Sequence, residues 1–417
     1  MLDYIFAMKK ISAVTFLCFA LTVLIVSADQ VREFTLEEVI AIGLEHNPYL
    51  SAQDQNAAAG EAGFRAARLW HNPSLAYQRG QARSWDRSVE RQTEGFSLTQ
   101  PIENPIKRHF RIQIAEQNWH AAENARDAAR LDAVFEIKRS FFKILLLQKK
   151  EEYTRKKEAS ILEIHKLMDT RARLGEVKEL EVIKLFVESL KAGKERKQVH
   201  AEWEISREEL NTILGNLLPS DFILEGKLDF APVIYDEKER IATALSSHPY
   251  LREKRLAVDS AQSAVNYTKW QVFPDFELTG FSEKHLDGKG SGIGVSLNIP
   301  LWNLGAHETE KAHYLLLQQS RMLNALELEV SAQVKAAIRR LRISEEALNI
   351  FYQGLLDQAE KSLRISELSY KQGEISLIDF LDAQRTYFSI LEDFQDALYT
   401  WNTDKAALEK AVGEQQP

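Results

Sequence analysis

The sequence has little cysteine, no long apolar run after its N-terminus and no excess of basic charge, and each of these absences excludes a class of protein or site. It contains one cysteine, Cys18, among 417 residues, so the chain beyond that point can form neither disulfides nor thiolate metal sites. After residue 28 no run of about 18 apolar residues occurs, and a membrane-spanning helix is therefore not expected there. The net charge of −8 excludes the basic footprint of a nucleic-acid-binding protein.

Motifs of enzymes and metal sites are missing as well. The sequence has no Gly-x-Ser-x-Gly elbow, no Walker loop and no Gly-x-Gly-x-x-Gly after a strand. Of the ten histidines, the two nearest, His307 and His313, are too far apart for the i, i+4 spacing of a helical zinc motif. Residues 288–292 are rich in glycine, but they fall in an expected hairpin loop. We therefore predict no catalytic residue, no resident metal and no cofactor.

The first feature that is present is an N-terminal targeting signal. Lys9 and Lys10 precede an apolar run over residues 11–26, and a Val-Ser-Ala tripeptide with small residues at the cleavage positions ends at residue 28. The run has about 16 residues, fewer than the roughly 20 that a spanning helix requires. We predict a cleaved secretory signal peptide over residues 1–28.

The rest of the chain is an internal duplication. Three landmarks of the first half return in the same order in the second half at a spacing of about 200 residues, far above the roughly 20–50 of stacked solenoid repeats. The matches are His46-Asn47-Pro48-Tyr49-Leu50 with His248-Pro249-Tyr250-Leu251, residues 95–101 with residues 294–300, and Gly175-Glu176-Val177 with Gly373-Glu374-Ile375. We predict two repeats, residues 29–230 and 231–417, each with a helix, a strand pair and a long helical hairpin.

The helical hairpins are indicated by composition and by spacing. Residues 106–172 and 306–371 contain no proline and few glycines and are rich in helix formers. About 66 residues at about 1.5 Å each form a helix near 100 Å long, too long for a compact domain. Apolar side chains alternate at spacings of three and four, which predicts coiled-coil contacts. They include Val134, Ile137, Phe141 and Ile144, and then Phe380, Tyr387, Leu391, Phe394, Leu398 and Trp401.

The strand pairs, at about residues 73–101 and 274–300, alternate apolar and polar side chains with a period of two. That period is typical of strands with one lipid face and one wet face. Two hairpins supply four strands, whereas about eight are needed to close even a narrow barrel. The chain must therefore oligomerise. Two copies would give a plugged lumen and three would give 12 strands around a pore, and we predict three.

The motif at residues 370–383, Tyr-Lys-Gln-Gly-Glu-Ile-Ser-Leu-Ile-Asp-Phe-Leu-Asp-Ala, resembles the TolC-type outer-membrane efflux family. The resemblance extends over about residues 34–413. It implies a mixed α/β membrane protein, a homotrimer whose 12-stranded outer-membrane β-barrel continues as a periplasmic α-helical coiled-coil barrel. It also implies a passive exit duct, not an enzyme, whose partners are a periplasmic adaptor, an inner-membrane pump and outer-membrane lipids.

Residues 66–75, Ala-Ala-Arg-Leu-Trp-His-Asn-Pro-Ser-Leu, are similar to the branch that serves heavy-metal efflux, the cobalt-zinc-cadmium type. The similarity favours divalent cations as cargo. One alternative is a general drug or type I secretion exit duct. An alternative of another class is a periplasmic coiled-coil adaptor, but an adaptor has one helical hairpin flanked by β-rich domains, and here two hairpins recur.

The resemblance also assigns roles near the tip turns at Gly175 and Gly373. Asp379 and Asp382 match two acidic residues that line the family's constriction, and their i, i+3 spacing puts both on one helix face. Three copies would stack two carboxylate rings into a cation-selecting filter, although such residues outside this motif are mostly ordinary solvated carboxylates.

Tyr370 and Glu181 match a hydrogen-bonded latch between the two tips. The basic residue that completes this latch in a family member is replaced here by Ile375. We therefore expect a different or looser closing network.

Overall fold

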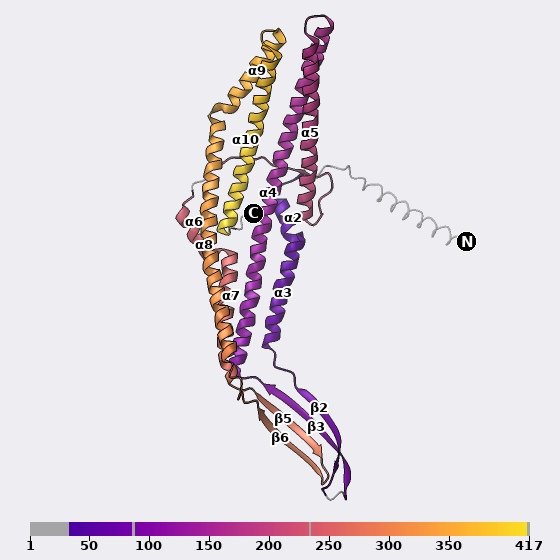
Figure 1. Cartoon of the computed structure of the whole chain (residues 1–417), viewed down its shortest axis with the longest axis vertical. Helices are drawn as coiled ribbons and strands as arrows, with labels where there is room; N and C mark the ends of the chain where they lie inside the picture. The colour runs from indigo at the N-terminus through magenta and orange to yellow at the C-terminus, as the bar shows by residue number, and fades with distance from the viewer. Residues whose placement is uncertain (1–32, 86–87, 233–234, 415–417) are drawn as a thin grey trace, which may run out of the picture.

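The computed structural model describes residues 33–85, 88–232 and 235–414. The predicted signal peptide at residues 1–28 lies outside the described residues. The described chain is a long rod of helices with a sheet at one end (Figure 1). Within these residues, no helix is both long and apolar enough to cross a membrane.

The helices of the two halves follow the same order. The first half has α2 (Leu36–His46), α3 (Pro48–Arg68), α4 (Pro105–Arg173) and α5 (Glu179–Ile213). The second half has α6 (Glu237–Ser247), α7 (Pro249–Lys269), the 3-10 turn η1 (Trp270–Val272), α8 (Ala306–Ile350), the π turn η2 (Phe351–Leu355), α9 (Leu356–Gln372) and α10 (Leu377–Val412). Helices α2 and α6 have 11 residues each, and α3 and α7 have 21 each. The duplication seen in the sequence is therefore also a duplication of elements.

In the described residues the strands form two sheets. β1 (Glu33–Phe34) pairs with β4 (Ile223–Leu224) beside the helices. The larger sheet is antiparallel in the order β2-β3-β5-β6, with β2 (Ser74–Arg83), β3 (Glu90–Ile102), β5 (Phe276–Lys284) and β6 (Lys289–Leu297). The predicted mixed α/β fold with four long strands per chain is confirmed.

Of the glycine-rich residues 288–292, only Gly288 lies in the loop that the sequence suggested, because β6 already begins at Lys289. Gly292 lies opposite Phe281 of β5. A Cβ at Gly292 would come within 2.9 Å of the Phe281 ring. Glycine thus leaves room for an aromatic ring over the strand, which a count of turn formers does not reveal.

The larger sheet has one apolar face. Cross-strand partners share a face of a sheet, and the register pairs Leu75 with Leu98, Tyr77 with Phe96, and Leu278 with Val295. The side chains that make up this apolar sheet face are all exposed in the single chain: Leu75, Tyr77, Phe96, Leu98, Ile102, Phe276, Leu278, Ile293, Val295 and Leu297. The opposite face is mostly small or polar. There the hydroxyls of Thr99 and Thr279 lie 2.9 Å apart.

The helical core follows the predicted seams. Ile137, Phe141 and Ile144 of α4 are buried, as are Leu398 and Trp401 of α10. These residues belong to one hydrophobic cluster, which packs helices from both halves against each other. The core therefore joins the two repeats and does not divide them.

The prediction of a continuous helix over residues 306–371 is wrong at one point. α4 runs unbroken for 69 residues, whereas η2 interrupts α8 and α9, and Gly354 there has φ 108°. Glycine adopts this conformation at little steric cost. The rings of Phe351 and Tyr352 pack on Phe394 of α10 with centroids 5.4 and 6.0 Å apart. The second hairpin consequently bends where the first is straight (Figure 1).

A cluster of ion pairs connects the larger sheet to the helices. The Glu103 carboxylate is 6% exposed, and Arg111 donates to both of its oxygens from Nε at 3.0 Å and from Nη2 at 2.6 Å. Lys107 Nζ lies 3.0 Å from Asp275 Oδ2, and the same carboxylate accepts the Asn104 N–H at 2.8 Å. Because Asp275 directly precedes β5, these bonds connect the start of α4 to both strand pairs.

Candidate functional site

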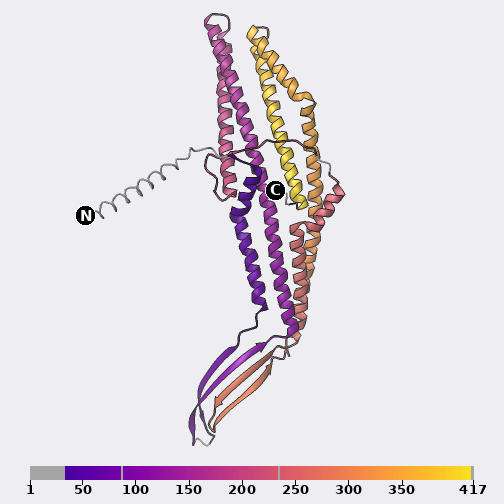
Figure 2. The ribbon, with the colours of Figure 1, turned by 180° about the vertical axis from the view of Figure 1, so that it is seen from behind.

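Both helical hairpins end at the pole of the rod opposite the sheet (Figures 1 and 2). Gly175, with φ 79°, and Gly373, with φ 81°, end α4 and α9 in the left-handed region. Each turn closes with the same two backbone hydrogen bonds. At the first tip Gly175 N–H donates to Ala172 O and Glu176 N–H to Arg171 O, and at the second Gly373 N–H donates to Tyr370 O and Glu374 N–H to Ser369 O. This arrangement is a Schellman motif. The predicted tip turns thus have one geometry, used twice.

The two tips pack on each other through what we call the tip cluster. It consists of the buried residues Ile164, Met168, Leu185, Tyr370, Leu377, Phe380 and Leu381. The ring of Tyr370 stacks on Phe380 with centroids 5.2 Å apart and planes 8° from parallel. Ile375, at the position where the resemblance expected a basic residue, packs against this cluster. Ile375 thus makes an apolar contact at a position where a charged side chain was expected.

Tyr370 and Glu181, the two residues of the predicted latch, are brought together. Tyr370 Oη lies 3.4 Å from Glu181 Oε2, a long hydrogen bond from α9 to α5. Burial, the negative charge of Glu181 and the hydrogen bond to it raise the pKa of Tyr370 to about 12. The phenol therefore keeps its proton at neutral pH and is the donor. Its role as a latch remains a prediction.

We expect Tyr370→Phe to loosen the contact between the tips. The ring stays stacked on Phe380, but Glu181 loses its donor, which costs about 0.5–1.5 kcal/mol for a typical hydrogen bond and falls at the low end of that range for a bond of 3.4 Å. In planar-bilayer recordings this should appear as more frequent or larger openings. Tyr352→Phe is a matched control, since Tyr352 is 60% exposed and far from the tips. Identical traces for Tyr370→Phe and the unaltered protein would contradict the latch.

The structure gives the two predicted filter residues, Asp379 and Asp382, different hydrogen-bonding environments. Both are exposed on α10. Asp379 belongs to a capping box, in which Oδ2 accepts the Ser376 hydroxyl at 2.7 Å and the Ser376 N–H at 3.2 Å. Asp382 forms no hydrogen bond or ion pair with any residue that the structure describes. Asp382 is thus exposed and unpaired among the described residues, whereas Asp379 also caps the start of its helix.

One charged contact near the tips was not predicted from the sequence. Arg385 of α10 donates to Glu188 of α5, with Nη2 and Oε1 2.9 Å apart, and Lys191 approaches the same oxygen at 3.0 Å. Burial favours a higher pKa for Glu188, but the hydrogen bond from Lys191 and the charge of Arg385 outweigh it, so the pKa lies below its usual value. A sequence signal existed: Arg385 is the single lysine or arginine between Lys371 and Lys405.

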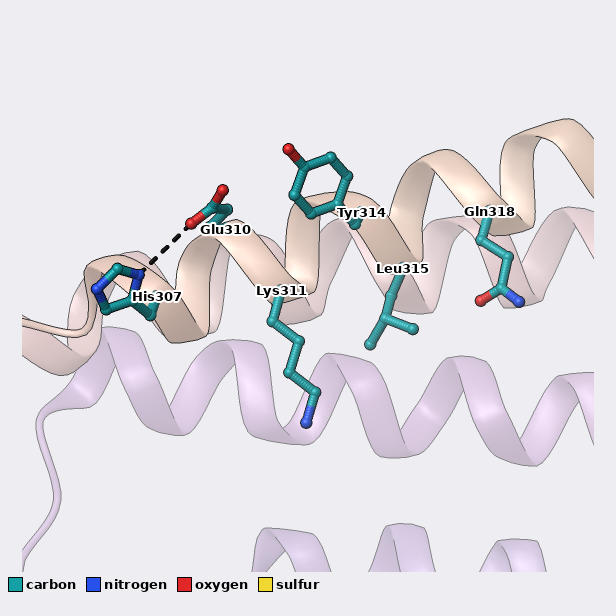
Figure 3. Close-up of a pocket in the computed structure, with 6 residues that line it drawn as sticks. All are labelled: His307, Glu310, Lys311, Tyr314, Leu315 and Gln318. Atoms are coloured by element: carbon teal, nitrogen blue, oxygen red, sulfur yellow. Dashed lines mark ion pairs between the residues drawn. The ribbon is translucent and has the colours of Figure 1, made fainter.

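A groove follows the first turns of α8 near the sheet (Figure 3). Its lining side chains all come from this one helix: His307, Glu310, Lys311, Tyr314, Leu315 and Gln318. His307 Nδ1 lies 3.5 Å from Glu310 Oε2. Across the part of the chain that the structure describes, no three histidine, cysteine or acidic side chains are placed to hold a metal ion. The groove has one wall and no converging ligands, so the tips remain the candidate site.

A rod of paired helices with an apolar-faced sheet at one pole and two turned tips at the other is the subunit of an outer-membrane channel. The family model for the outer membrane efflux protein matches residues 39–216 and 241–414. The chain belongs to this family. Membership places it in the outer membrane, with its helical portion in the periplasm, and among channels rather than among enzymes.

Individual relatives are similar in sequence to this protein over most of its length. The cobalt-zinc-cadmium resistance protein CzcC of Cupriavidus metallidurans is 23% identical over 356 residues, which cover 85% of this chain and 84% of that protein. Outer membrane protein TolC of Vibrio cholerae is 22% identical over 406 residues, 91% of this chain and 90% of that protein.

Solved structures share the fold. The crystal structure of CusC matches with a TM-score of 0.77 at 14% identity, over 91% of this chain and 92% of that one. The CmeC outer membrane channel of Campylobacter jejuni matches with a TM-score of 0.79 at 16% identity, over 92% of this chain and 87% of that one.

Proposed function

We propose that this protein is the passive outer-membrane exit duct of a tripartite efflux system. Three copies would close their sheets into one 12-stranded barrel and continue it as a helical barrel through the periplasm. The observation that carries this proposal is the sheet itself. β2 and β6 are its outer strands, each paired on one side within the described chain, and the apolar sheet face is open to solvent. Long unpaired edges of this kind are avoided in soluble monomers, and closure into a barrel removes them.

The tips support the helical part of the proposal. Leu180, Ile183, Val187 and Leu190 of α5 are all exposed in the single chain, and their spacing of three, four and three forms one apolar stripe. A stripe of this spacing packs against another helix. In the proposed trimer, the helices of a neighbouring copy supply that contact. The tips then face the periplasmic adaptor and the inner-membrane pump that complete the system.

The test is where the protein resides and in what form. We expect cell fractionation to recover it from the outer membrane, and detergent extraction to give a trimer that resists heating before electrophoresis. A soluble periplasmic monomer would overturn the proposal and favour the coiled-coil adaptor.

For the cargo we propose divalent heavy-metal cations. The similarity to CzcC, whose name gives cobalt, zinc and cadmium, extends over 85% of this chain, and the cation efflux protein CusC of Escherichia coli is 24% identical over 325 residues. The exposed carboxylate of Asp382 suits a cation. The alternative, a general drug or type I secretion duct, is favoured by similarity to the alkaline protease secretion protein AprF of Pseudomonas aeruginosa, 22% identical over 410 residues.

Deletion of the gene distinguishes these cargoes. We expect the minimal inhibitory concentrations of zinc, cobalt and cadmium salts to fall several-fold, with little change for dyes and detergents. Restoring the gene should restore growth on metal. Equal sensitisation to metals and dyes would indicate a general exit duct instead.

A further inference from the structure

The part of α10 that carries the proposed filter has one basic side chain. Arg385 is the single lysine or arginine between Lys371 and Lys405. It follows Asp382 by three residues, which places the two side chains on the same helix face as neighbours. Oppositely charged residues at this spacing attract each other. A free Arg385 would therefore pair with Asp382.

In the structure Arg385 is turned to another helix. Its Nη2 lies 2.9 Å from Oε1 of Glu188 on α5. The Glu188 side chain is 19% exposed, whereas that of Arg385 is 59% exposed. Lys191, one turn further along α5, donates to the same Glu188 oxygen at 3.0 Å. Glu188 is thus the fixed partner of this pair, and Arg385 is the partner that it orients.

The consequence concerns net charge. Three copies of Asp382 give three negative charges around the duct axis, and three arginines released beside them would cancel that charge. A ring of carboxylates selects cations only while its charge is not neutralised. The cation preference of the duct then depends on the position of the Arg385 side chain as well as on Asp382.

We infer that Glu188 is a specificity-determining residue of the duct: by binding Arg385 against α5, it leaves the Asp382 carboxylate unpaired and accessible to cations. Glu188 acts through Arg385 and is a positioning residue. This inference rests on the proposed function, because it requires a channel whose narrow end is formed by these tips.

The test uses the purified full-length trimer in planar bilayers, with the reversal potential measured across a potassium chloride gradient. Glu188→Gln frees Arg385, and a pair on the helix surface is weak, so we expect a roughly twofold fall in the potassium-to-chloride permeability ratio. Arg385→Gln removes the cation and should raise the ratio. The double variant should equal or exceed the unaltered protein.

Opposite changes in the permeability ratio for Glu188→Gln and Arg385→Gln would exclude a merely structural role of the ion pair. If the ion pair only ties the tips together, Glu188→Gln and Arg385→Gln break the same bond and shift conductance in the same direction, with the permeability ratio unchanged; that result would overturn the inference. Lys191→Gln is the matched control, because it removes the other partner of Glu188 without releasing Arg385, and it should leave the ratio near that of the unaltered protein.

Failure of the inference and failure of the proposed function are distinguishable. An unaltered trimer that forms no channels refutes the proposed function together with the inference. Channels with a normal cation preference in Glu188→Gln refute the inference alone. Retained heat resistance of each variant trimer shows that the substituted proteins are folded.

Discussion

Replacement of Asp379 and Asp382 by asparagine should abolish most of the cation preference of the duct. The double variant removes two rings of three carboxylates from the proposed constriction, and direct charge is what such rings use to select ions. The structure indicates that the two aspartates contribute unequally to this preference. Asp382→Asn alone should produce most of the loss, because this carboxylate has no partner among the described residues, whereas Asp379 is bonded to Ser376.

Reversal potentials in planar bilayers measure this effect. Asp379→Asn should instead weaken the start of α10, by about 0.5–1 kcal/mol for a capping interaction. Asp287→Asn, in the turn between β5 and β6 at the opposite pole, removes the same charge and serves as the control. Unchanged selectivity in the double variant would remove both aspartates from the filter.

The largest loss of stability is expected from Glu103→Leu. Arg111 would keep its place at the junction of sheet and helices with no carboxylate to accept its hydrogen bonds. Breaking a buried ion pair by removing one partner typically costs about 3–5 kcal/mol, and we expect the lower end because Arg111 is 25% exposed. The melting temperature of the detergent-solubilised protein, followed by circular dichroism, should fall clearly.

Glu360→Leu is the comparison for that measurement. Glu360 pairs with Arg364 on the surface of α9, and both side chains are more than half exposed. Exposed pairs contribute about 0–1 kcal/mol, so this variant should melt close to the unaltered protein. Equal melting temperatures for Glu103→Leu and Glu360→Leu would show that the junction pair is dispensable.

Sequence patterns predicted the parts of this fold that rest on periodicity. Alternation of apolar residues with a period of two located the strands, and the heptad seam through Leu398 and Trp401 located the core, because each period belongs to one kind of element. The break at Gly354 was not predicted. One glycine within a run of helix formers does not reveal that its φ is 108°.

At the tips, the outcome depended on whether a family motif named both partners of an interaction, since Tyr370 and Glu181 are 189 positions apart. Tyr370 and Glu181 were paired through a family motif, and their contact is present at 3.4 Å. The capping box of Ser376 and Asp379 was not predicted, although its two residues are only three positions apart. The bond between Arg385 and Glu188 joins residues 197 positions apart. It depends on the register of one hairpin against the other, which no local pattern contains.

From the interruption at η2 we expect the two hairpins to differ in stiffness. The α4 helix resists bending along its 69 residues, whereas the chain that rises to the second tip has a joint below α9. We expect a load applied to both tips to be relieved mostly by bending between α8 and α9, beside α10, which carries Asp382 and has 36 residues without a break. The duplication produced two similar arms, but the helices of the first are unbroken, whereas the second has a place at which it can bend.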